Sequence, residues 1–197
     1  MEINVDNKGV RLGMWLFLYT EIMLFGGLFV LYAAYYYRYS QDFIAAGRET
    51  ELFIGTLNTA ILLTSSFTVA SAIAAMKRES KKAVLVFLSI TIILAMAFLV
   101  NKYFEWSHKF EHGFYPGSNK LANEMGKSMF FGLYFTLTGL HALHICIGII
   151  VLSTCLGLTA AGRITAERIN ILENSGLYWH LVDIIWIFLF PLFYLLL

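Results

Sequence analysis

The sequence predicts an all-α fold: a polytopic membrane protein built as a bundle of five transmembrane helices. Of 197 residues, 59% are hydrophobic and only 14% are charged, which is not the composition of a water-soluble domain. Crossing the hydrocarbon layer takes about 20 apolar residues in a helix, and five segments are long enough. No alternating segments of about ten residues recur between turns, as a membrane barrel would require.

Five predicted spans follow one another with mostly short connections. They cover residues 12–37, 52–76, 83–104, 127–158 and 175–197. The apolar stretch behind the polar start MEINVDNKGVR is longer than the core of a cleavable signal peptide, so we expect it to remain as the first span. Several spans exceed the minimum length, which indicates tilt or extension beyond the bilayer. Residues 1–197 are predicted to form a single transmembrane domain.

The distribution of Lys and Arg predicts the orientation. The N-terminus shares a side with the links after the second and fourth spans, which together carry Lys8, Arg11, Lys77, Arg78, Lys81, Lys82, Arg163 and Arg168. The other side has Arg38, Arg48, Lys102, Lys109, Lys120 and Lys127. This modest bias places the N-terminus in the cytoplasm and the C-terminus outside. The net charge of +1 offers no basic field for nucleic acid, and no phosphate-binding glycine motif is present.

Glu21 is the acid placed most deeply in the first span. It lies about 15 Å from the start of the span at 1.5 Å per residue, near the middle of a core about 30 Å thick. Burial there favours the neutral acid unless a positive partner or a water chain compensates. Glu21 is either a proton-handling or partner-contacting carboxylate, or a protonated acid bonded to a neighbouring helix. The rarity of intramembrane acids favours the first interpretation.

Two histidines share one face of the fourth span, in TGLHALHICIG. His141 and His144 are spaced i, i+3, and such a pair could ligate a metal or haem irons. No further ligand completes a known spacing. The favoured interpretation is that the imidazoles donate across helices to carbonyls, acids or lipid headgroups.

The fifth predicted span begins with YWHLVDIIW. His180 and Asp183 are spaced i, i+3, while Trp179, Asp183 and Trp186 form an overlapping stripe. Tyr178, Trp179 and His180 are expected at the membrane–water interface, where amphipathic rings anchor helices. Asp183 is either paired with His180 or with a residue of the fourth span, or is one satisfied acid beside an interfacial belt.

Other polar residues have simpler predicted roles. The second span carries amide and hydroxyl side chains suited to interhelical hydrogen bonds: Asn58, Thr59, Thr64, Ser65 and Ser66. Glu105 and His108 follow the third span, and we expect them to be solvated there. No Ser-His-Asp, HExxH or CxxC arrangement is present, so we predict no catalytic residue and no metal ligand in this chain.

Taken in order, four of these segments resemble subunit III of haem-copper respiratory oxidases. They are WLFLYTEIMLF, NTAILLTSS, TGLHALHICIG and YWHLVDIIWIFLFPLFY, and the resemblance extends over nearly the whole chain. It is closest to the short, five-helix bacterial form of cytochrome c oxidase subunit III. Longer members have seven helices, with lipid held between the first two and the other five. Thr20 stands where serine is commoner, and Leu181 where phenylalanine is.

The resemblance implies a subunit without haem or copper, docked against subunits I and II of a proton-pumping oxidase in the bacterial inner membrane. Haem and copper would belong to those partners, and cytochrome c would be the electron donor, with only indirect contact. Glu21 would take the place of the family's carbodiimide-reactive acid. The residues expected to pack helices or bind phospholipid are His141, His144, His180, Asp183, Trp179 and Glu105. The subunit would support proton uptake, sustained turnover and oxygen access.

Alternatives remain open at this point. An accessory subunit of nitric oxide reductase has the same five-span pattern, and a quinol oxidase subunit III differs only in the donor of its complex. An autonomous b-type cytochrome could use His141, His144 and His180, although two histidines at i, i+3 cannot ligate one haem from opposite faces. A small transporter would need broken helices or an inverted repeat, and neither is evident.

Overall fold

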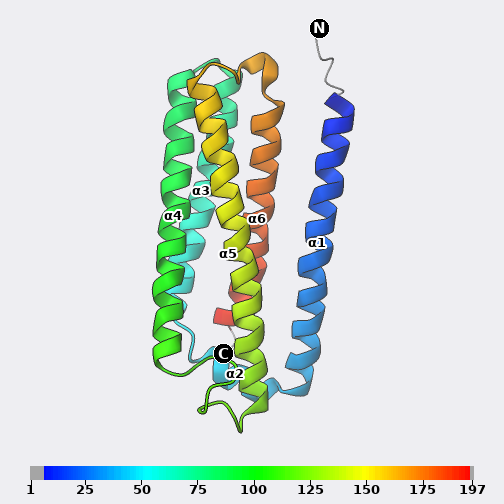
Figure 1. Cartoon of the computed structure of the whole chain (residues 1–197), viewed down its shortest axis with the longest axis vertical. Coiled ribbons are helices and arrows are strands. Elements are labelled where there is room, and N and C mark those ends of the chain that lie inside the picture. The colour runs from blue at the N-terminus through cyan, green and yellow to red at the C-terminus, as the bar shows by residue number, and fades with distance from the viewer. Residues whose placement is uncertain (1–6, 196–197) are drawn as a thin grey trace.

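The computed structural model describes residues 7–195 and is helical throughout that range apart from its connections (Figure 1). The elements are α1 (Asn7–Arg38), α2 (Ser40–Gly47), α3 (Leu52–Lys77), α4 (Lys81–Glu111), α5 (Met125–Ala160), a short 3-10 helix η1 (Ala166–Arg168) and α6 (Asn170–Tyr194). Five of these helices are long and apolar enough to cross a membrane. The predicted all-α fold with five spans is confirmed.

The helices extend beyond several predicted spans. α4 continues to Glu111, well past the predicted end at residue 104, and α6 begins at Asn170, ahead of the predicted start at residue 175. The end of the fifth predicted span, residues 196–197, lies outside the described residues, as do residues 1–6. The link 38–51 contains α2, which the sequence analysis did not predict.

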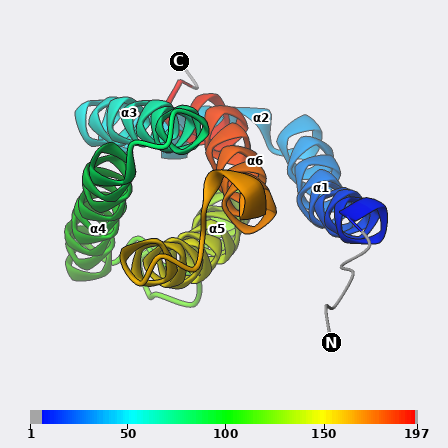
Figure 2. The ribbon, with the colours of Figure 1, turned by 90° about the horizontal axis from the view of Figure 1, so that it is seen from above.

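α6 is the central helix and α1 the peripheral one. In the view along the bundle, α6 lies among α3, α5 and α1, while α1 stands to one side of the other long helices (Figure 2). In the most apolar stretch of each helix, 56% of the residues are buried in α6 but only 11% in α1. Most of the α1 surface therefore faces whatever surrounds this chain.

An aromatic cluster holds the second half of α1 to the bundle. Tyr32 donates a hydrogen bond to the carbonyl oxygen of Leu192 at 2.5 Å. Its ring meets Phe43 of α2 edge-on, with centroids 5.4 Å apart, and Phe43 meets Phe130 in the same way. Edge-on aromatic pairs add stability beyond the area they bury, so α2 serves as a packed strap between α1 and α5.

Glycines allow α6 to approach its neighbours closely. A Cβ atom at Gly148 of α5 would lie 2.5 Å from the Trp179 ring, and one at Gly55 of α3 would lie 2.6 Å from the Tyr194 ring. Real side-chain contacts are not that short, so both positions require the absence of a side chain. Small residues at such contacts are typical of helix packing in membranes.

The connections gather at two opposite ends of the bundle. The α3–α4 turn and the α5–α6 link lie at the end where α1 begins, and α6 finishes at the opposite end (Figure 1). At the same end, Lys77, the last residue of α3, pairs with Glu173 in the first turn of α6 at 2.8 Å. Of the basic residues counted for the other side, Lys102 and Lys109 are 1% and 3% exposed. Both lie in the second half of α4, toward that end of the bundle, and the orientation stays a prediction.

Candidate functional site

Glu21 of α1 and His144 of α5 meet across the helix interface. The Oε2 atom of Glu21 lies 2.8 Å from Nε2 of His144, and the side chains are 15% and 10% exposed. Nδ1 of His144 lies 2.8 Å from the carbonyl oxygen of Leu140. A carbonyl can only accept, so Nδ1 carries a hydrogen. The pair therefore holds one proton between Oε2 and Nε2, as acid and imidazole or as carboxylate and imidazolium.

Aromatic residues surround this pair. Phe25 meets the His144 ring edge-on with centroids 5.3 Å apart. The hydroxyl of Tyr178 donates to the backbone carbonyl of His144 at 3.0 Å, and the Tyr178 ring lies 6.0 Å from that of Phe17. The pair thus joins α1, α5 and α6 in an apolar setting. The predicted bond from an imidazole to an acid on another helix is present at His144.

His141 behaves differently, although it lies on the same face of α5. It is fully buried between Phe98 and Trp186, with ring centroids 5.6 and 5.2 Å away. Neither ring nitrogen has a hydrogen-bond partner within residues 7–195. Among those residues, no group of three or more His, Cys, Asp and Glu side chains is placed to hold a metal.

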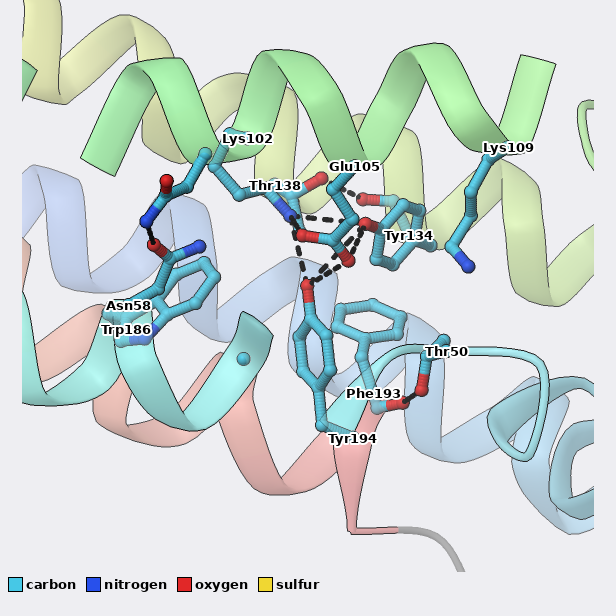
Figure 3. A network of polar contacts seen from close by, with 12 residues as sticks. Thr50, Asn58, Lys102, Glu105, Lys109, Tyr134, Thr138, Trp186, Phe193 and Tyr194 are labelled. Atoms are coloured by element: carbon cyan, nitrogen blue, oxygen red, sulfur yellow. Dashed lines mark hydrogen bonds and ion pairs between the residues drawn. The ribbon is translucent and has the colours of Figure 1, made fainter. Parts of the chain in front are cut away.

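A buried ion pair lies near the end of the bundle where α6 finishes. Nζ of Lys102 is 2.9 Å from Oε2 of Glu105, one turn further along α4. The hydroxyls of Tyr134 and Tyr194 each donate to Oε1 of Glu105 at 2.6 Å. Figure 3 shows these four side chains converging from α4, α5 and α6. We call them the closed network.

Every strong hydrogen-bonding position in the closed network is filled. Besides Glu105, the Lys102 ammonium donates to Tyr134 at 3.1 Å and to Tyr194 at 3.0 Å, which uses all three of its donors. Four aromatic rings lie within 6 Å of Nζ, the nearest being Tyr134 at 4.9 Å. Such complete satisfaction is what makes a buried ion pair tolerable.

The expected solvation of Glu105 was wrong, because Glu105 is 1% exposed. α4 does not end before it, and the last residues of α6 cover it. The sequence analysis also missed Lys102, Tyr134 and Tyr194 as members of one site. A signal was available in part: Lys102 and Glu105 are spaced i, i+3 and so share a helix face.

The link between α2 and α3 closes the bundle beside this network. Nζ of Lys109 donates to the carbonyl oxygen of Glu49 at 2.7 Å. The hydroxyl of Thr50 donates to the backbone carbonyl oxygen of Phe193 at 2.9 Å. Nearer the surface, His108 pairs with Glu51 at 2.9 Å and is 54% exposed. His108 is solvated as expected.

A third polar group joins α3 and α6. Oγ of Ser66 lies 2.6 Å from Nδ1 of His180. Asp183, one turn along α6, is 3% exposed, and neither of its carboxyl oxygens has a hydrogen-bond partner in the part of the chain described. The predicted pairing of Asp183 with His180 or with α5 is absent among the described residues, where Asp183 interacts with Ser66 instead. We call Ser66, His180 and Asp183 the open cluster.

The sequence analysis placed Trp179 and Tyr178 in an interfacial belt, and the structure does not. They are 0% and 6% exposed, since both rings point into the bundle. The indole N–H of Trp179 donates to Ser65 at 3.1 Å. Tryptophan can be buried in this way when its N–H finds a partner.

The polar residues of α3 make the predicted interhelical bonds. Trp186 donates to Thr59 at 3.0 Å, and Asn101 donates to Asn58 at 2.9 Å. Thr64 differs, because its hydroxyl donates to the carbonyl oxygen of Ala60 in its own helix. The interior of the bundle is thus held by hydrogen bonds as well as by apolar packing.

These features define a class: a multi-pass helical membrane protein whose buried ionisable groups are held by other side chains. Comparison with known proteins gives the family. The family model described as Cytochrome c oxidase subunit III matches residues 2–196. The chain belongs to that family, as its resemblance to subunit III of haem-copper oxidases predicted.

Individual relatives cover nearly all of the chain. Cytochrome c oxidase subunit 3 of Bacillus subtilis is 31% identical over 198 residues, which is 99% of this chain and 90% of the relative. Quinol oxidase subunit 3 of Bacillus spizizenii is 32% identical over 94% of this chain and 86% of its own length. Heme-copper oxidase subunit I+III of Aeropyrum pernix is 29% identical over 94% of this chain and 22% of that longer protein.

Proposed function

We propose that this chain is the non-catalytic subunit III of a proton-pumping terminal oxidase in a bacterial cytoplasmic membrane, with its N-terminus in the cytoplasm. It docks against subunits I and II, which carry the haem and copper. The fused subunit I+III of Aeropyrum pernix supports the first of these partners, since fusion places both subunits in one protein. Glu21 exchanges a proton with its surroundings, and bound phospholipid covers part of the apolar surface.

The observation that carries the proposal for Glu21 is its hydrogen bond to His144. A shared proton can move between the two atoms by a small change in the surroundings, because both forms keep the 2.8 Å bond. The pair is also not sealed, since each side chain retains some exposure. An acid that is partnered, mostly but not fully buried, and within a membrane span is suited to proton exchange.

Replacing Glu21 in the assembled oxidase tests this role. We expect Glu21→Gln to abolish carbodiimide labelling of this chain, to slow proton uptake and to shorten the time over which turnover persists. Initial oxygen reduction stays close to normal, because the redox centres lie in partner subunits. Glu111→Gln, which alters an exposed acid at the end of α4, is the matched control.

If Glu21→Gln leaves labelling, proton uptake and sustained turnover all unchanged, Glu21 has no proton-related role. Purification gives a separate test of the subunit assignment. A polypeptide that leaves the membrane in mild detergents without any haem-copper partner would contradict it. Haem bands in a reduced-minus-oxidised spectrum of the isolated chain would instead support the autonomous cytochrome.

Cytochrome c is proposed as the donor of the complex, with quinol as the alternative. The relatives include both cytochrome c oxidase and quinol oxidase subunits at similar identity, and the donor site lies outside this chain. Oxygen consumption by the purified complex with reduced cytochrome c, compared with a reduced quinol, decides between them. A complex that reduces nitric oxide but not oxygen would point to the reductase alternative.

A further inference from the structure

Ser66 and His180 of the open cluster lie at an outer surface formed by α1, α3 and α6, with Asp183 buried beside them. The outward side chains of α6 include Ile184, 49% exposed, and Phe188, 58% exposed, with His180 partly exposed one turn before Ile184. Phe188 contacts Phe29 of α1, with ring centroids 6.2 Å apart. Ser66 ties the same stretch of α6 to α3. We call this surface the α1–α3–α6 face; it comprises Gly26, Ser66, Phe67, His180, Ile184 and Phe188.

One hydrogen-bonding position on this face is unfilled by the described residues. Nδ1 of His180 is taken by Ser66, and no hydrogen bond reaches Nε2 from any described residue. Whichever ring nitrogen carries the hydrogen, Nε2 remains a donor or an acceptor in need of a partner. Asp183, almost fully buried beside the same pair, interacts with Ser66, but neither carboxyl oxygen has a hydrogen-bond partner among the described residues.

The depth of His180 excludes most partners. Its partner Ser66 lies ten residues from the nearer end of the predicted span 52–76, so about 15 Å along α3, near the middle of the hydrocarbon. Lipid tails offer no hydrogen bond, and the lipid headgroups are separated from His180 by about the thickness of one leaflet of the hydrocarbon core. Leaving an imidazole nitrogen unpaired in hydrocarbon is unfavourable. The partner must therefore be a polar side chain carried by another membrane-spanning helix.

Exposed hydroxyl groups elsewhere on α3 do not need a hydrogen-bond partner from outside the chain. Thr56, Thr64 and Ser71 each donate to the carbonyl oxygen four residues before them. They can face lipid without loss, whereas the His180 ring is too rigid to reach its own backbone from Nε2. The α1–α3–α6 face thus differs from other exposed parts of the bundle by its unfilled position and not by hydrophobicity alone.

Gly26 provides room for close approach on the same face. It precedes Phe29 by one turn of α1, and a Cβ atom built at Gly26 would meet no heavy atom within 4 Å. A glycine that packs against nothing in its own chain lets the backbone of a second helix come close.

We infer that the α1–α3–α6 face is the docking surface for a transmembrane helix of the oxidase partner, and that this helix presents a hydroxyl, carboxamide or carboxyl side chain to Nε2 of His180. The inference rests on the proposed function, which supplies an integral membrane partner. It adds which helices of this chain meet that partner and what chemistry the contact uses.

Photo-cross-linking in the assembled complex tests the face directly. A photoreactive amino acid in place of Ile184 is expected to form an adduct with the haem-bearing polypeptide, identified by mass spectrometry. The same residue in place of Ile150, which is 66% exposed on α5, reports what an unrelated face contacts. An adduct at residue 184 with lipid only, or with a second copy of this chain, overturns the inference.

Two substitutions give an independent measurement, the amount of this chain retained per haem after detergent extraction. We expect Gly26→Leu and His180→Phe each to lower retention about threefold or more, the usual effect of one lost interhelical hydrogen bond or contact in a membrane. Gly157→Leu is the matched control, because a Cβ at Gly157 of α5 also meets nothing within 4 Å. Unchanged retention in both test variants would overturn the inference.

The two proposals fail in distinguishable ways. If the unaltered chain never co-purifies with a haem-copper partner, the proposed function fails. If the complex is intact but residue 184 labels only lipid, the oxidase assignment stands and the α1–α3–α6 face is not its docking surface.

Discussion

The closed network and the open cluster each contain a buried carboxylate, Glu105 in one and Asp183 in the other, yet they differ in completeness. Lys102 and Glu105 have every strong hydrogen-bonding position filled by each other and by Tyr134 and Tyr194. Asp183 is as deeply placed but has no partner for its carboxyl oxygens among the residues described. A buried ionisable group can therefore either stabilise its own bundle through filled hydrogen bonds or remain available to a partner outside the chain.

Electrostatics explains why completeness matters. In a medium of low polarity, a satisfied polar network strengthens each of its bonds, whereas a partly satisfied one is more costly than an apolar core. The closed network brings together three helices that are far apart in sequence, so it stabilises the bundle directly. The open cluster joins α3 to α6 through one bond at Ser66 and gains its full stability only with an external partner.

The largest expected effect comes from breaking the closed network on one side. Lys102→Met leaves the Glu105 carboxylate buried without its counter-charge, and we expect a loss of about 3 to 5 kcal/mol in the free energy of unfolding. The double variant Lys102→Met, Glu105→Leu should lose less than Lys102→Met alone, because no isolated charge remains. Reversible denaturation of the chain in mixed detergent micelles measures both.

Equal or greater destabilisation of the double variant would mean that the ion pair itself, and not the stranded charge, holds the helices together. The closed network would then owe its stability to direct attraction rather than to mutual satisfaction.

A smaller effect is expected at the edge of the same network. Tyr194→Phe removes one hydroxyl that donates to Glu105 and accepts from Lys102, while the ring stays in place. Bonds to charged groups are worth about 1.5 to 3 kcal/mol in soluble proteins and less in membranes, so we expect a loss of about 1 to 2 kcal/mol. Tyr103→Phe, at a residue 68% exposed on α4, should show no loss in the same measurement.

The five-span fold was predictable because a membrane imposes helix length and hydrophobicity on each segment separately. The candidate site was predictable only in part. The sequence identified Glu21 and His144 as unusual for their setting, and their meeting across α1 and α5 fits the expectation for an imidazole. It did not indicate which acid the imidazole would meet, because that depends on how two distant helices are rotated.

The errors have a common physical origin. Glu105 and Trp179 were assigned to water and to the interface because their residue types are commonest there. Both are buried, since tertiary partners such as Tyr194 and Ser65 satisfy them. A single sequence shows what each residue would need, but not whether a residue a hundred positions away supplies it.

Trp179 tests the boundary between the two regions, since it packs beside the open cluster yet is fully satisfied. Trp179→Phe removes the indole N–H that Ser65 accepts and leaves a gap against Gly148. We expect a loss of about 1 kcal/mol from the bond, with a further contribution from packing. Trp15→Phe is the control, because Trp15 is 61% exposed on α1; a loss there equal to that at residue 179 would contradict the assignment.

The smallest effect on the isolated chain is expected at Asp183. Since the carboxyl group makes no hydrogen bond within residues 7–195, replacing it breaks none, and Asp183→Asn should change the free energy of unfolding by less than about 1 kcal/mol. Asp183→Leu should be neutral or stabilising, because it removes an unpaired buried polar group. A loss comparable to that of Lys102→Met would show that Asp183 is tied into the bundle after all. In that case the open cluster would stabilise the bundle as the closed network does, and the two regions would no longer differ in the completeness of their hydrogen bonding.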